Sequence, residues 1–163
     1  MREFNLRNVT LMAAAASCFI QIGAQLFAIS VIMRTVVQAP PRSFAIYGGE
    51  YGYDSSSFWN TVPPITALLL VIALATNWKT QRRNPLLIAL VVFVLGGTVA
   101  GVFLEPTFAE MMVVGYSDSI DPALQRRAAS WYAMDWAVWT FSLLAGGALL
   151  AALVRPADVG VRD

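Results

Sequence analysis

Asp135 is the side chain in this sequence whose position most strongly indicates chemistry, because it interrupts an apolar run that continues to Val154. At helical spacing it shares a face with Trp131 and Trp139, since residues four apart are neighbours on a helix. An acid within a membrane helix is costly to desolvate, so it normally faces a partner or a wet cavity. The alternative is a helix start at the membrane interface, where tryptophans belong to the headgroup belt and Asp135 still reaches water. The pattern alone leaves both interpretations open.

Glu105 is a second carboxyl group, expected at the same end of the molecule as Asp135. It continues a row that contains Gly97 and Gly101, whose spacing of four residues lets a neighbouring helix approach closely. We therefore expect these glycines to face another helix, in this chain or in a partner. Pro106 follows directly and is expected to bend or end the helix. A buried carboxyl group can act as a general base, so Asp135 and Glu105 are the two catalytic candidates.

Polar and aromatic residues of the same region are candidates for ligand contacts. Gln21 and Gln25 lie one turn apart within an apolar run, where amides must find partners. Arg34 ends that run, and pairing with an acid would reduce the cost of burying either charge. The ligand-binding candidates are Gln21, Gln25, Arg34, Trp59, Trp131 and Trp139. The alternatives are hydrogen bonds between helices for the glutamines and solvated charges at the interface for Arg34 and the two acids.

Four apolar runs must position these side chains, and each is about long enough to cross roughly 30 Å of hydrocarbon as a helix. Of the 163 residues, 58% are hydrophobic and only 13% are charged, which is a membrane composition. The sequence therefore predicts an all-α integral membrane four-helix bundle that forms a single domain over residues 1–163. The expected helices cover about 9–33, 57–77, 85–104 and 128–154.

The composition also excludes several kinds of function. The net charge of +1 says little about partners, but the lack of a basic stripe argues against a nucleic-acid partner. Histidine is absent and Cys18 is the only cysteine, which removes His-ligated haem, a Ser–His–Asp triad and a cysteine zinc cluster. We expect neither a metal nor a cofactor.

The distribution of Lys and Arg predicts the orientation of the chain in the membrane. With four spans, both termini and the loop 78–84 lie on one side, which carries Arg2, Arg7, Lys79, Arg82, Arg83, Arg155 and Arg162. The other side carries four basic residues, namely Arg34, Arg42, Arg126 and Arg127. By the positive-inside rule both termini are cytoplasmic. We expect a multi-pass protein of a bacterial inner membrane, surrounded by membrane lipids.

The connection over residues 35–56 is long for a small bundle, and loops of this length are usually functional or disordered. Its aromatic residues, Phe44, Tyr47, Tyr51 and Tyr53, argue against disorder because they can cover apolar surface. We therefore expect an aromatic loop over the non-cytoplasmic end of the bundle.

Three short motifs occur in a characteristic order: Phe58-Trp59 opens the second run, LEPTFAEM closes the third, and RRAASW leads into the fourth. This order resembles the anthrone-oxygenase-like family of small four-helix membrane proteins, much of which has no known function. The resemblance implies oxygenation of anthrones to anthraquinones without metal or flavin. The chain departs from the family where a histidine and an arginine often follow the tryptophan of the fourth helix. Those places hold Asp135 and Val138, so the fold carries over more readily than the chemistry.

Two hypotheses of different classes follow. In the first, the protein binds a flat lipophilic molecule in a pocket at the non-cytoplasmic end, with cofactor-independent oxygenation as a further step. Asp135 or Glu105 would then ionise a phenol or anthrone so that its carbanion reacts with oxygen. In the second, the chain is a non-catalytic accessory subunit of a larger membrane complex, respiratory or photosynthetic, and its small-residue stripes pack against other subunits. Whether the chain is an enzyme stays open at this point.

Overall fold

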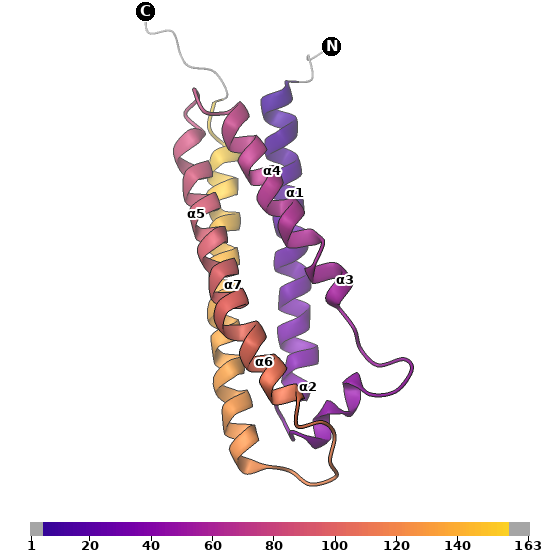
Figure 1. Ribbon diagram of the computed structural model, residues 1–163. Coiled ribbons are helices and arrows are strands. Elements are labelled where there is room, and N and C mark those ends of the chain that lie inside the picture. The colour runs from indigo at the N-terminus through magenta and orange to yellow at the C-terminus, as the bar shows by residue number, and fades with distance from the viewer. Residues whose placement is uncertain (1–4, 157–163) are drawn as a thin grey trace, which may run out of the picture.

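The computed structural model describes residues 5–156, and within that range the chain forms four helical spans and no strand (Figure 1). The spans are Leu6–Val36, Ser56–Thr76, Arg83–Met112 and Pro122–Leu153. Each is long and apolar enough to cross a membrane. The predicted all-α four-helix arrangement is therefore confirmed, and the chain is a multi-pass membrane protein.

The first span is longer than the predicted helix over 9–33. It begins with α1 (Leu6–Phe27), whose first turn is capped by the side chain of Asn5, which accepts a hydrogen bond from the N–H of Arg7 at 3.1 Å. A π-helical segment, η1 (Ala28–Met33), and the short α2 (Arg34–Val36) complete the span.

The second span is broken near its start. A short helix, α3 (Ser56–Trp59), is followed by α4 (Val62–Thr76) after a turn at residues 60–61. Pro63 lies in the first turn of α4, where its missing N–H has no helical partner to lose. Figure 1 shows α3 set to one side of α4. With 15 residues, α4 is only about 22 Å long at about 1.5 Å per residue.

The third span continues past Pro106, so the predicted helix end at about residue 104 was wrong, and of the two effects expected of this proline, a bend or an end, the end is excluded. The span consists of α5 (Arg83–Val99), a second π-helical segment η3 (Ala100–Leu104), and α6 (Glu105–Met112). Pro106 lies in the first turn of α6, directly after the wider π turns, where a missing N–H is tolerated.

The fourth span, α7 (Pro122–Leu153), begins six residues before the predicted start at 128. The side chain of Asp121 accepts hydrogen bonds from the N–H groups of Ala123 at 2.7 Å and Leu124 at 3.3 Å. Pro122 occupies the first helical position. Together they form a favourable helix start. Asp135 consequently lies more than three turns into the helix rather than at its mouth.

The helices pack in a ring in which α1 contacts α4 and α7, and α5 also contacts α4 and α7. Helix α5 approaches α7 closely at Gly96, where a Cβ atom would lie 2.9 Å from the Cβ of Phe141. Gly97 and Gly101 are exposed and have open space around them. The expectation that these two glycines face another helix is therefore wrong within this chain, because the close contact falls one residue earlier.

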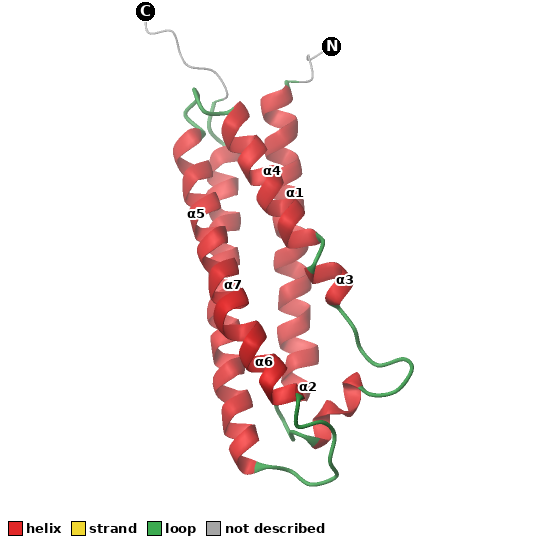
Figure 2. Ribbon diagram, viewed as in Figure 1, coloured by secondary structure: helices red, strands yellow, loops and turns green. Residues whose placement is uncertain are grey.

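Two connections close the end of the bundle away from the termini (Figure 2). Residues 37–55 include a 3-10 helix, η2 (Arg42–Tyr47), and residues 113–121 join α6 to α7. The N–H of Asp121 donates to the carbonyl of Pro40 at 3.0 Å, and the side-chain amide of Gln125 donates to the carbonyl of Gln38 at 2.6 Å. The two connections are thus joined to each other and to the start of α7.

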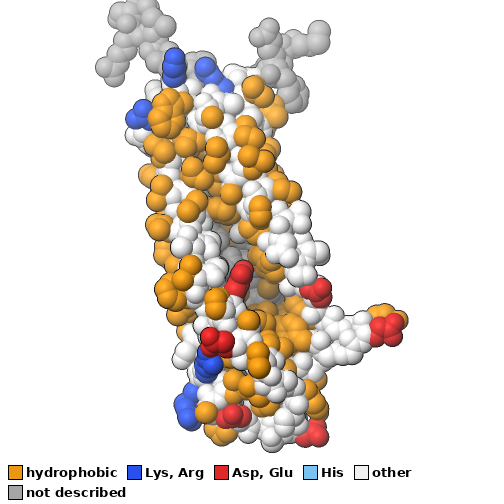
Figure 3. Space-filling model, in the orientation of Figure 1, with side chains coloured by type: hydrophobic (Ala, Val, Ile, Leu, Met, Phe, Trp, Pro, Cys, Tyr) orange, Lys and Arg blue, Asp and Glu red, His pale blue; other side chains and the backbone are white. Residues whose placement is uncertain are grey.

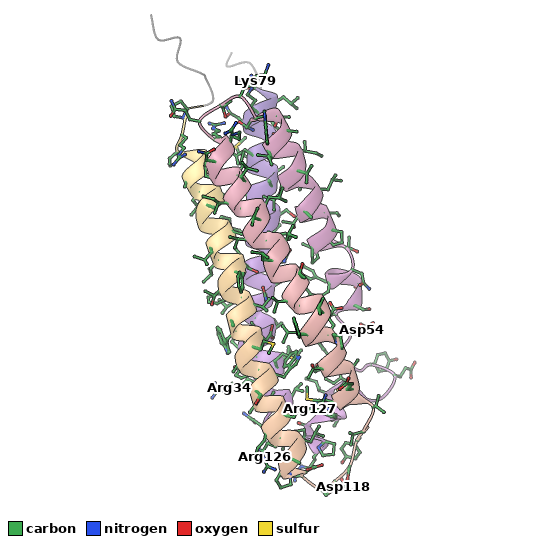
Figure 4. All side chains as sticks on the ribbon, turned by 60° about the vertical axis from the view of Figure 1, so that its left-hand side comes forward. Arg34, Asp54, Lys79, Asp118, Arg126 and Arg127 are labelled. Atoms are coloured by element: carbon green, nitrogen blue, oxygen red, sulfur yellow. The ribbon has the colours of Figure 1, made fainter. Side chains whose placement is uncertain are left out.

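Charge is distributed unevenly between the two ends (Figures 3 and 4). The end that holds the start of α1 and the end of α7 is basic, and Lys79 lies there in Figure 4. The acidic residues of the described range all belong to the other half of the molecule: Glu50, Asp54, Glu105, Glu110, Asp118, Asp121 and Asp135. That half also carries Arg34, Arg42, Arg126 and Arg127.

Candidate functional site

A cavity of about 460 Å³ lies in the half of the bundle away from the termini. It exists because α4 begins only at Val62, so that three long spans continue beyond it without a fourth. The short α3 and residues 53–56 supply the remaining wall. Figure 3 shows the hollow on this face of the molecule. Its volume is in the range of ordinary small-molecule sites, roughly 300–1,000 Å³.

Both π-helical segments border this cavity. Segment η1 contributes Ala28, Ile29 and Met33, and segment η3 contributes Ala100 and Leu104. A π turn is a rare interruption of an α-helix and is frequent at functional sites. Ala28 and Ala100 leave space in the cavity that larger side chains would fill. The sequence pattern did not reveal either segment.

A chain of aromatic rings runs along one wall. The ring centroids of Tyr53 and Tyr47 are 6.0 Å apart, those of Tyr47 and Phe108 are 5.8 Å apart, and those of Phe108 and Trp131 are 5.1 Å apart. The indole N–H of Trp131 donates to the carbonyl of Leu104 at 2.9 Å, which fixes the ring against η3. Burial, followed by the proximity of Tyr53, raises the pKa of Tyr47, so its hydroxyl stays protonated.

Asp135 is buried, with 9% of its surface exposed, and it lines the cavity. Its carboxyl group is hydrogen-bonded to the side chain of Gln25. The amide oxygen of Gln25 in turn accepts a hydrogen bond from the Ser142 hydroxyl at 3.0 Å. With its oxygen occupied, Gln25 directs its NH₂ group to Asp135. The polar groups of α1 and α7 thus form a short chain that ends at the cavity.

Two further acids lie at the rim. Glu105, the first residue of α6, and Asp54, in the loop before α3, both line the cavity and are both exposed. The backbone N–H of Ser56 donates to the carboxylate of Asp54 at 2.8 Å and lowers the pKa of Asp54. Asp54 therefore carries its negative charge at neutral pH.

Five of the eight candidate residues line the cavity: Gln25, Trp59, Glu105, Trp131 and Asp135. The structure brings together both catalytic candidates, although they come from different helices and Asp135 is the only one of the two that is buried. Asp135 faces inward rather than toward the headgroups, which agrees with the first of the two interpretations of its helix face.

The other three candidates lie elsewhere. Arg34 is exposed and does not line the cavity, so it does not neutralise Asp135 or Glu105 in the described structure (Figure 4). The indole of Trp139 donates to the carbonyl of Ile22 at 3.2 Å and packs against the core between α1 and α7. Gln21 is half-buried, and its amide oxygen has no hydrogen-bond partner within residues 5–156.

Several cavity residues were not among the candidates. Tyr47 and Tyr53 were expected only to cover apolar surface as part of the aromatic loop, and Asp54 and Phe108 were not singled out. A usable signal was the Asp121-Pro122 pair, which marks the true start of α7. It would have placed Asp135 deep in its helix, level with the residues around Glu105.

Comparison of the chain with family models, with curated proteins and with solved structures finds no match. The resemblance to the anthrone-oxygenase-like family therefore remains a prediction from the motifs quoted above.

Proposed function

We propose that this membrane protein binds a lipophilic small molecule in the cavity between η1, η3 and α7. The observation that carries the proposal is the combination of an apolar, aromatic-walled cavity with one buried carboxyl group, Asp135, aimed into it. Binding sites for small molecules are typically concave, mostly apolar and equipped with a few polar groups that orient the ligand.

We further propose that the cavity lies at the non-cytoplasmic side of the membrane. Within the described residues, the basic end carries Arg7, Lys79, Arg82, Arg83 and Arg155 and no acid. The positive-inside rule supports a cytoplasmic location for that end, as in a bacterial inner membrane. Asp135 lies about 30 Å along the helix axis from Arg155 at about 1.5 Å per residue, which supports a position near the opposite boundary of the hydrocarbon. A ligand could then enter from the outer leaflet or the headgroup region.

The oxygenase form of this proposal requires Asp135 or Glu105 to remove a proton from a bound phenol or anthrone. Both carboxyl groups line the cavity, which supports a role as base. The carbanion formed would, however, lie beside three acids, and no Lys or Arg is among the described residues of the cavity. Such surroundings disfavour an anion. We therefore propose binding of the lipophilic molecule rather than its oxygenation.

The alternative role as an accessory subunit rests on a different observation. Gly97 of α5 and Gly101 of η3 lie on the outer surface of the third span with open space beside them. Small residues on a lipid-facing surface permit close approach by a helix of another chain. This observation supports a partner on α5, which is compatible with a ligand in the cavity.

The binding proposal is tested by purifying the protein in a mild detergent and identifying extracted lipophilic molecules by mass spectrometry. Ala100→Phe places a ring at the cavity wall and should remove the bound molecule. Ala109→Phe is the matched control, because Ala109 is exposed on α6 and does not line the cavity. Equal retention of the molecule by both variants, or no specific molecule in the unmodified protein, would contradict the proposal.

A further inference from the structure

The charges that face the cavity are all of one sign. Asp54, Glu105 and Asp135 line it, and its described lining contains no Lys or Arg. A carboxyl group buried like Asp135 must either hold a proton or be neutralised by a cation, because an isolated buried charge is strongly unfavourable. Gln25 donates a hydrogen bond to it but brings no charge. No side chain of the described lining supplies a positive charge to Asp135, whose carboxyl group lines the cavity.

The cavity that Asp135 lines is also lined by five aromatic side chains. Tyr47, Tyr53 and Phe108 come from the loop and α6, whereas Trp59 and Trp131 come from α3 and α7. The face of an aromatic ring is electron-rich and attracts cations, most strongly for tryptophan. Carboxylates and several aromatic rings around one cavity are the combination that recognises ammonium groups.

The same geometry argues against a metal ion as the cation. Within residues 5–156 no three His, Cys, Asp or Glu side chains come together closely enough to hold one. The three acids are instead distributed between the cavity interior and its rim. The remaining wall is apolar and includes Ala28, Ile29 and Ala100. Distributed negative charge beside an apolar wall suits a cation that is large, weakly hydrated and attached to an apolar chain.

We propose that the cavity takes an amphipathic organic cation, a protonated amine or a quaternary ammonium group that carries an apolar chain, with Asp135 as its counter-ion. This inference rests on the proposed function and names the class of its ligand. The charged group lies between Asp135 and the rings of Trp131 and Phe108. The apolar chain lies along η1 and η3, and Asp54 and Glu105 attract the cation to the entrance.

The experiment is calorimetric titration of the purified full chain in maltoside micelles, with blank titrations into empty micelles. The probes are decyltrimethylammonium, its neutral counterpart decanol, and decanesulfonate as the anion. The cation is expected to bind at least about tenfold more tightly than decanol. A tenfold difference in Kd corresponds to a difference of about 1.4 kcal/mol in binding free energy, which is within the range of cation–π interactions. Decanesulfonate is expected to bind more weakly still, because it meets three acids.

Two variants test the role of individual carboxyl groups. Asp135→Asn keeps the size of the side chain and should abolish the preference for the cation while decanol binding is retained. Glu105→Gln changes an exposed residue at the rim, does not endanger folding, and should weaken cation binding by a few-fold. The matched control is Glu110→Gln on the same helix, since Glu110 pairs with Arg127 and does not line the cavity. This control should bind like the unmodified protein.

The outcomes separate this inference from the proposed function. Equal binding of decanol and the cation, unchanged in Asp135→Asn and Glu105→Gln, would overturn the cationic ligand and leave a lipophilic cavity. Failure of every probe to bind would contradict both proposals.

An ammonium group could come from a free amine or from a phospholipid headgroup. Adding phosphatidylethanolamine or phosphatidylglycerol to the micelles distinguishes these sources. Competition with decyltrimethylammonium by phosphatidylethanolamine alone indicates a lipid headgroup, and no competition by either lipid indicates a free amine. Equal competition by both lipids would overturn the selectivity for a cation.

Discussion

The hydroxyl of Ser142 on α7 donates a hydrogen bond to the side-chain oxygen of Gln25 on α1 at 3.0 Å. This contact determines which way the amide of Gln25 points, and so it directs the NH₂ group toward Asp135. The two helices are far apart in sequence, and the bond links their packing to the polar group in the cavity. Gln25 is therefore both a tie between helices and a cavity residue, which the sequence presented as alternatives.

Ser142→Ala is predicted to lower the free energy of unfolding by about 1 kcal/mol, because the buried oxygen of Gln25 loses its donor. Thermal unfolding in detergent measures the change. Ser130→Ala serves as the control, since the Ser130 hydroxyl is exposed and bonds only to the carbonyl of Arg126 in its own helix at 3.2 Å. Equal stability of the two variants would show that the bond between Ser142 and Gln25 contributes nothing.

The glycines of α5 are predicted to differ sharply in their tolerance of larger side chains. Gly96→Leu should lower the free energy of unfolding by about 1–3 kcal/mol or more, because a Cβ there already meets Phe141 at 2.9 Å. Gly97→Leu should leave the stability of the isolated chain almost unchanged, as nothing lies within 4 Å. Thermal unfolding of both variants checks this. A similar loss in Gly97→Leu, together with a smaller assembly, would indicate a partner chain on α5.

Arg82 is predicted to hold the basic end together. It is buried, its Nε donates to the carbonyl of Arg155 at 2.8 Å, and its Nη1 donates to the side-chain oxygen of Asn8 at 2.6 Å. Arg82→Ala should cost about 2 kcal/mol or more of stability, because bonds from a charged donor are lost. Lys79→Ala removes the same charge from an exposed residue of the same loop and should cost little. Comparable melting temperatures for the two variants would argue against this role.

Orientation in the membrane can be measured with introduced cysteines. Cys18 is only 1% exposed and should react little with an impermeant maleimide. In intact cells, Ser119→Cys, at the end away from the termini, should be labelled, whereas Lys79→Cys should be labelled only after the cells are opened. The reverse pattern would place the basic end outside and contradict the proposed location of the cavity.

Helix number and class were predictable from the sequence because long apolar runs have few other stable structures. The spacing of Trp131 and Trp139 placed Asp135 on one helix face with them, but it left open whether that face points into the bundle or toward the headgroups. The cavity itself was not predictable, because it depends on the break before Val62 and on the two π segments, which leave no mark in an apolar pattern. The exposure of Arg34 was also not predictable. Its place in the sequence indicates how far along the helix it lies, but not whether its side chain points into the bundle or away from it.

The cavity is tested most directly by photolabelling the protein with a diazirine derivative of decanol and mapping the adducts by peptide mass spectrometry. The account predicts adducts at Phe108 and Trp131 that disappear in Ala100→Phe and persist in Ala109→Phe. Adducts confined to outward-facing residues such as Val94 and Val102, unchanged by Ala100→Phe, would contradict it.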